Sequence, residues 1–117
     1  MVKYSTRHYS TNQEKQVAKR IGGKRTSNSG ATLFSKGDIK TKDFIIECKT
    51  VTKEQKSFSI KKDWIIKLKE EAFAMGKSNW AISFNFGGEN SIREENYYII
   101  SENTFKILKQ MLENEYE

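Results

Sequence analysis

Three segments of the chain carry hydrophobic residues at helical spacing. The first, residues 12–21, places its apolar residues on one side and stops at Gly22 and Gly23. The second, residues 61–75, stops at Gly76, and the third follows Ser101, a residue type that caps helices. The apolar faces of the three segments comprise Val17, Ala18 and Ile21; Trp64, Ile65, Leu68 and Ala72; and Phe105, Leu108, Met111 and Leu112. This spacing predicts three amphipathic helices.

Between these segments the pattern favours strands. Residues 44–50 form an apolar, β-rich run that predicts a buried central strand. Shorter strands are predicted at residues 31–34, 80–86 and 97–100, and residues 35–37 read as a turn leading into 38–41. The polar stretches at 24–30, 53–57 and 87–95 are predicted loops.

The order is therefore helix, two or three strands, helix, strand, strand, helix. It predicts an α/β fold with a mixed central sheet flanked by helices. A chain of 117 residues is large enough for a single core, so we expect a single domain. Residues 1–11 show no periodicity and are expected to be a flexible basic arm that precedes a domain spanning residues 12–117.

Charge is unevenly distributed along the chain. Residues 1–62 hold 15 Lys and Arg against 5 Asp and Glu, whereas residues 63–117 hold 6 against 10. The basic half suggests a polyanionic partner, although a solvated basic surface would look the same. With one cysteine, no signal-peptide-like start and no apolar run long enough for a membrane span, we expect an intracellular protein, cytoplasmic or viral and acting in a host cell.

The candidate chemistry lies around the central strand. Side chains alternate across a strand, so Glu47 and Lys49 share one face and Cys48 points to the other. Asp38 precedes Glu47 by nine residues, and a hairpin turning near residues 41–43 would bring the two carboxylates together. Such a pair is stable when one group is protonated or when a cation joins them. An ordinary ion pair between Glu47 and Lys49 at a strand end is the alternative.

Mg²⁺, with Mn²⁺ as a substitute, suits two carboxylates and a backbone carbonyl. We expect Asp38, Glu47 and the Cys48 carbonyl to be the metal ligands. Lys49 would then lie beside the attacking water, either orienting it as a cation or accepting its proton. The chemistry that this set suits is hydrolysis of a phosphodiester bond.

These residues resemble the PD-(D/E)xK nuclease superfamily, most closely the archaeal-type Holliday junction resolvases. The resemblance covers residues 12–86, although Gly37 stands where the superfamily usually has proline. The matching features are Glu14 in the first helix, Ser29-Gly30, Asp38, Glu47-Cys48-Lys49, Phe58-Ser59-Ile60 before the second helix, and the strand at 80–86. The resemblance implies a restriction-endonuclease-like sheet and a metal-dependent, structure-selective endonuclease that acts on four-way DNA junctions in DNA recombination and repair.

The resemblance also makes Glu14 a third acid, contacting the metal directly or through water. Alternatively, Glu14 only complements the positive end of a helix dipole. The basic loop would contact phosphates through Lys24, Arg25, Ser27, Asn28, Ser29 and Gly30, with a disordered polar loop as the alternative. Two matched incisions imply a homodimer. A restriction-like or flap-type nuclease, or an inactive DNA-binding module of the same fold, is the alternative function.

Overall fold

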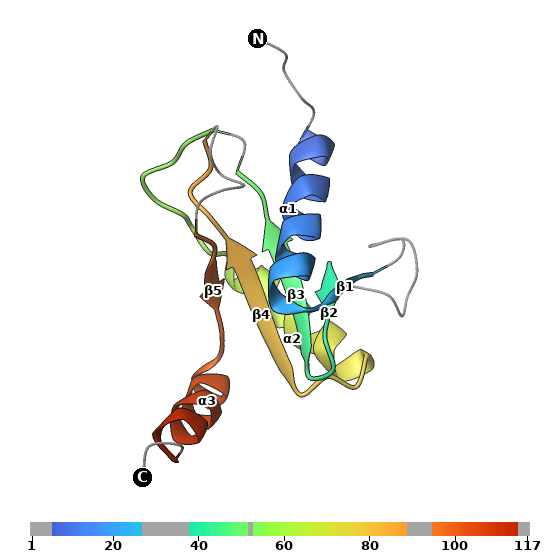
Figure 1. Ribbon diagram of the computed structural model, residues 1–117, viewed down its shortest axis with the longest axis vertical. Coiled ribbons are helices and arrows are strands. Elements are labelled where there is room, and N and C mark those ends of the chain that lie inside the picture. The colour runs from blue at the N-terminus through green and yellow to red at the C-terminus, as the bar shows by residue number, and fades with distance from the viewer. Residues whose placement is uncertain (1–5, 27–37, 52, 89–94, 115–117) are drawn as a thin grey trace.

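Five strands form one mixed sheet in the order β1-β2-β3-β4-β5 (Figure 1). The computed structural model describes residues 6–26, 38–51, 53–88 and 95–114. Strands β1, β2 and β3 pair antiparallel, β3 and β4 pair parallel, and β4 and β5 pair antiparallel. The strands are β1 (Lys24–Arg25), β2 (Ile39–Lys40), β3 (Phe44–Lys49), β4 (Asn79–Phe84) and β5 (Tyr97–Ile99).

A tight turn sets the register of β2 and β3. The Thr41 N–H donates to the Phe44 carbonyl at 3.0 Å, and the Phe44 N–H donates to the Thr41 hydroxyl at 3.1 Å. Ile39 consequently faces Ile46 across the two strands. The helix between β3 and β4 supplies the crossover that parallel strands require.

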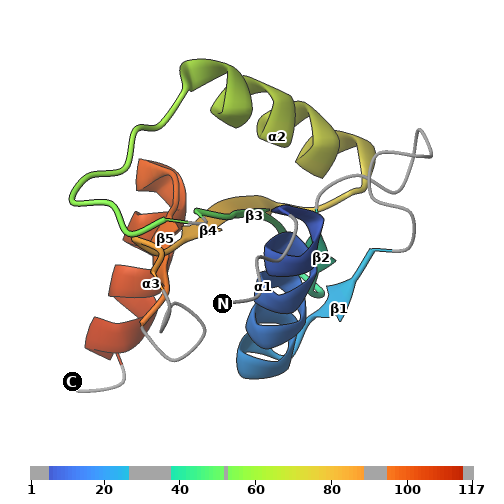
Figure 2. The same cartoon turned by 90° about the horizontal axis from the view of Figure 1, so that it is seen from above.

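The helices cover the sheet from both sides. They are α1 (Thr6–Ile21), α2 (Lys62–Ala74) and α3 (Glu102–Asn114), with α2 on one side of the sheet and α1 on the other (Figure 2). Two core clusters result, because alternate residues of β3 and β4 face opposite sides. The cluster under α2 contains Ile45, Leu68, Ala72, Trp80 and Ile82, and the cluster under α1 contains Val17, Ile39, Ile46 and Ala81.

The predicted helix boundaries hold at three of the ends. Gly22 (φ 73°), directly after α1, and Gly76 (φ 68°), one residue beyond the Met75 cap of α2, take left-handed conformations. That conformation suits glycine, so both residues end their helices as predicted. The Ser101 hydroxyl accepts a hydrogen bond from the Thr104 N–H at 3.1 Å, which caps α3 as predicted.

Two boundaries differ from the prediction. α1 begins at Thr6 rather than near residue 12, so residues 6–11 of the expected arm belong to the helix. Once a helix is nucleated by its packed part, each added residue gains a hydrogen bond without needing an apolar face. Lys24 and Arg25, predicted to lie in a loop, pair with β2 through their backbones. The strand predicted at 31–34 and the turn at 35–37 lie outside the described residues.

The architecture is thus one α/β unit with a mixed sheet flanked by helices, as the sequence predicts. None of the helices in the described part of the chain has the length and apolar character needed to cross a membrane.

Candidate active site

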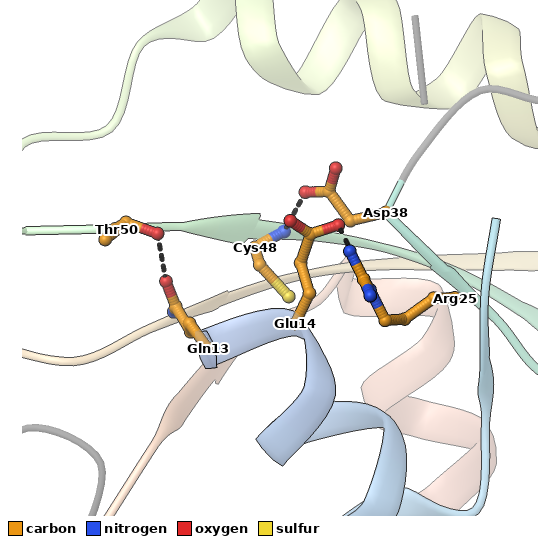
Figure 3. Close-up of polar contacts among 6 residues, drawn as sticks. All are labelled: Gln13, Glu14, Arg25, Asp38, Cys48 and Thr50. Carbon is orange, nitrogen blue, oxygen red and sulfur yellow. Dashed lines mark hydrogen bonds and ion pairs between the residues drawn. The ribbon is translucent and has the colours of Figure 1, made fainter. Parts of the chain in front are cut away.

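The hairpin of β2 and β3 brings Asp38 to Glu47. Asp38 directly precedes β2, and Ile39, the next residue, pairs with Ile46 of β3. Asp38 is held there twice: its own N–H donates to the Ile46 carbonyl at 3.0 Å, and its Oδ2 accepts from the Cys48 N–H at 2.7 Å (Figure 3). The hairpin therefore places Asp38 beside the end of β3 that carries Glu47, close enough for the charge of Glu47 to raise the pKa of Asp38.

Glu47 and Lys49 share the face of β3 that is turned toward α2. Ile45, on the same face, is buried under that helix. The Lys49 Nζ lies 3.4 Å from the Glu47 Oε1 and 4.0 Å from the centre of the Trp64 ring. The two charged side chains are about a quarter exposed, 23% for Lys49 and 27% for Glu47. Lys49 thus lies between a carboxylate and an aromatic face, within reach of solvent.

Glu14 approaches the same point from α1. Its side chain is only 14% exposed, and its Oε1 lies 4.0 Å from the Arg25 Nε on β1. Figure 3 shows the Glu14 and Asp38 carboxylates directed toward the same place beside the Cys48 amide. The face of α1 that buries Val17 therefore also places the Glu14 carboxylate at the end of the sheet where Asp38 lies.

Burial raises the pKa values of Asp38 and Glu14, and repulsion by other acids adds to the rise at Asp38. The pKa of Asp38 is raised to about 6, first by burial and further by the negative charges of Glu14 and Glu47, against the Cys48 N–H and Lys49, which lower it. Burial also raises the pKa of Glu14, although Arg25 opposes the rise. Of the two basic groups, Arg25 pairs with Glu14 and Lys49 pairs with Glu47. Asp38 is therefore the acid whose charge is least compensated.

Cys48 contributes its backbone, and its thiol lies elsewhere. The side chain packs against the apolar cluster under α1. Burial raises the pKa of the thiol, and the charges of Asp38, Glu14 and Glu47 raise it further, so the thiolate is strongly disfavoured. A strand residue directs its N–H and its carbonyl to the same side. The Cys48 carbonyl therefore points to the edge where the N–H meets Asp38.

The donor set is compatible with a hard divalent cation. Within the described ranges, no group of three or more His, Cys, Asp or Glu side chains is arranged to hold a metal ion. The expected ligand set needs only two of these side chains, the carboxylates of Asp38 and Glu47, together with the Cys48 carbonyl. A cation would also offset the repulsion that raises the pKa of Asp38.

Two contacts that position residues of this site cannot be predicted from the sequence motifs alone. Gln13, only 5% exposed, donates from Nε2 to the Lys49 carbonyl at 2.9 Å and accepts from the Thr50 hydroxyl at 2.5 Å (Figure 3). It thereby ties α1 to the end of β3. The available signal was its position four residues before Val17, which puts an amide on the apolar face of the helix. The second contact, of Trp64 with Lys49, leaves no comparable signal in the sequence.

The expected DNA-contacting residues are described only in part. Lys24 and Arg25 are exposed on β1, the edge strand of the sheet, next to the strand that follows Asp38. Ser27, Asn28, Ser29 and Gly30 lie outside the described residues.

Comparisons with protein-family models, curated proteins and solved structures find no match for this chain.

Proposed function

We propose that this chain is a metal-dependent DNA endonuclease that hydrolyses phosphodiester bonds, with a four-way junction as its preferred substrate. One observation carries the proposal: the Asp38 carboxylate meets the Cys48 N–H, the charges of Glu14 and Glu47 act on that carboxylate, and Lys49 pairs with Glu47. A buried carboxylate whose pKa is raised further by two neighbouring acids is costly to a fold, and such perturbed groups concentrate at functional sites.

The carboxylates of Asp38 and Glu47, with the Cys48 carbonyl, would hold Mg²⁺ or Mn²⁺. The bound ion would supply positive charge to the scissile phosphate and lower the pKa of the attacking water. Glu14 would contribute a third carboxylate, acting on the ion directly or through water, while Arg25 restrains its side chain at 4.0 Å.

Lys49 would act on the attacking water or on the phosphate. Glu47 and the Trp64 ring hold its Nζ from two sides, which restricts the rotamers of a long side chain. A lysine that is already ordered loses less entropy when it meets the transition state. Gln13 would support the same end of β3 through the Lys49 carbonyl.

We further propose a restriction-endonuclease-like arrangement of the sheet, DNA contacts from the β1 edge, and a homodimer. The mixed sheet and the motif order support the first. The exposed Lys24 and Arg25 beside the site support the second, since basic side chains neutralise phosphates. The approximate two-fold symmetry of a junction supports the third, because two matched cuts need two sites.

The direct test is a cleavage assay with Mg²⁺ across four substrates of related sequence: a four-way junction, a flap, a linear duplex and a single strand. We expect cleavage that requires the metal and is fastest on the junction. Equal cleavage of junction and duplex would indicate a general nuclease instead of a resolvase. Binding without cleavage of any substrate would leave an inactive DNA-binding module.

A further inference from the structure

The last helix leaves most of its apolar face uncovered. Thr104, 3% exposed, anchors α3 through a 3.0 Å hydrogen bond from its hydroxyl to Asn79 Oδ1. Beyond that point the large apolar side chains of the helix are open to solvent: Phe105 (58%), Ile107 (46%), Leu108 (40%), Met111 (62%) and Leu112 (60%). Figure 1 shows α3 set apart from the other two helices, at the end of β5.

An apolar groove adjoins this face. It has a volume of about 400 Å³, and its walls include Ile21 of α1, Ile46 of β3, Tyr98 of β5 and Leu108 of α3. Leu108 belongs both to the groove and to the exposed face of α3, so the two features form one continuous apolar surface. Tyr98 is itself 40% exposed. We call this surface, made of the five α3 side chains and the groove, the α3 face.

Charge separates the α3 face from the proposed DNA surface. Helix α3 carries two acidic and two basic residues, Glu102, Lys106, Lys109 and Glu113, and is therefore neutral. Neither DNA phosphates nor an anionic membrane would be attracted to it, since amphipathic membrane helices carry a basic polar face. Two neutral helices, in contrast, meet without repulsion.

The extent of the α3 face matches a modest dimer interface. A large side chain exposed by about half leaves on the order of 100 Å² accessible. The five α3 side chains and Tyr98 then present roughly 500–600 Å² on each copy, the upper end for the largest apolar patch of a monomer. A two-fold contact would bury about 1,000 Å² or more in total, the lower bound of a specific interface.

We infer that the α3 face binds a second copy of this chain, each copy placing its α3 side chains against the groove of the other. A surface that holds both a projecting apolar helix and an apolar groove is self-complementary, as an isologous two-fold contact requires. The inference does not depend on the chemistry at Asp38. It assigns a surface to the homodimer proposed above.

The test is sedimentation equilibrium of the full chain without DNA or metal, over a wide range of concentration. We expect a mass of twice the 13.6 kDa of one chain. Leu112→Glu should raise the dimer dissociation constant roughly 100-fold, because each copy would carry an unpaired charge into an apolar contact. Met111→Glu should act similarly. Both residues are exposed, so circular dichroism should show an unchanged fold.

Phe73→Glu is the matched control, since Phe73 is 88% exposed on α2, away from the α3 face. It should leave the dissociation constant unchanged. A monomer at every concentration, a dimer insensitive to both α3 variants, or equal disruption by Phe73→Glu would overturn the inference. So would a monomer that sediments with anionic phospholipid vesicles, which would make α3 a membrane-binding helix. A dimer that cuts no DNA would leave the interface intact and reject only the nuclease.

Discussion

The carboxylate of Asp38 accepts a 2.7 Å hydrogen bond from the backbone N–H of Cys48, the residue between Glu47 and Lys49. This bond connects the residue that precedes β2 to the part of β3 that carries Glu47 and Lys49. It favours the charged form of Asp38, yet burial and the neighbouring acids prevail and raise the pKa to about 6. The hydrogen bond thus fixes the position of the Asp38 carboxylate, while burial disfavours its ionised form.

The first prediction concerns stability against pH. Because the folded-state pKa of Asp38 lies above its ordinary value of 3.8, the folded protein binds a proton more tightly than the unfolded chain. Stability contributed by this group is therefore full below about pH 4 and is lost as the pH rises through about 6. Asp38→Asn removes the charge and keeps an oxygen that can accept the Cys48 N–H. Its melting temperature, relative to wild type, should increase from pH 4 to pH 8.

The matched control is Asp43→Asn, an exposed carboxylate at the turn of the same hairpin. Its melting temperature relative to wild type should stay nearly constant over that range. A constant difference for Asp38→Asn as well would show that Asp38 ionises normally in the folded protein.

The second prediction concerns Lys49. Lys49→Ala should reduce turnover much more than DNA affinity, because one phosphate contact is a small part of a large interface, whereas a group that acts on the attacking water is needed in the transition state. Lys61→Ala is the control, since the Lys61 Nζ lies 5.9 Å from the centre of the same Trp64 ring. Single-turnover rates and binding isotherms, measured together, separate the two effects. Equal losses in rate and affinity would make Lys49 a binding residue only.

The third prediction concerns Trp64 as a positioning residue. A cation–π contact at a partly exposed site contributes about 0.5–1 kcal/mol, so losing it should slow turnover roughly two- to fivefold. Trp64→Leu should show this loss, and Trp64→Phe, which keeps a ring, should recover part of the rate. Melting temperatures of both variants report any loss of core packing. If Trp64→Phe and Trp64→Leu cleave equally slowly, packing rather than the ring face explains the effect.

The central part of the fold was predictable because it depends on side-chain patterns. The apolar run of β3 identified the middle of the sheet, and the sequence separation of Asp38 and Glu47 matched a short hairpin. Glu14 stood out as a carboxylate on an apolar helical face, and it is indeed mostly buried beside Asp38.

The remaining features depend on backbone pairing and on contacts between distant residues. Lys24 and Arg25 form β1 through main-chain hydrogen bonds, while both side chains stay exposed and show no strand pattern. The start of α1 at Thr6 likewise has no apolar signature. The contact of Trp64 with Lys49 depends on how α2 packs over β3, which the order of residues does not reveal.

The fourth prediction concerns the β1 edge. Lys24→Ala combined with Arg25→Ala should weaken binding to every DNA shape and flatten its salt dependence, by about 0.9 in the log–log slope for each lost phosphate contact on duplex DNA. Removal of Arg25 also removes the group that lowers the pKa of Glu14, so that pKa should rise further. Lys67→Ala with Lys69→Ala, two exposed lysines on α2, is the charge-matched control. An unchanged slope would exclude β1 from the DNA interface.

The most direct measurement is single-turnover cleavage of a four-way junction in Mg²⁺ by wild type, Asp38→Asn, Glu47→Gln and the control Asp43→Asn. Wild type and the control should cleave alike. Each site variant should be slower by at least about a hundredfold, the scale of losing one transition-state interaction. Binding in Ca²⁺, which occupies such sites with looser geometry, should be retained or tightened, because the lost carboxylate no longer repels phosphate. Cleavage by Asp38→Asn or Glu47→Gln at a rate near that of wild type would contradict the proposed site.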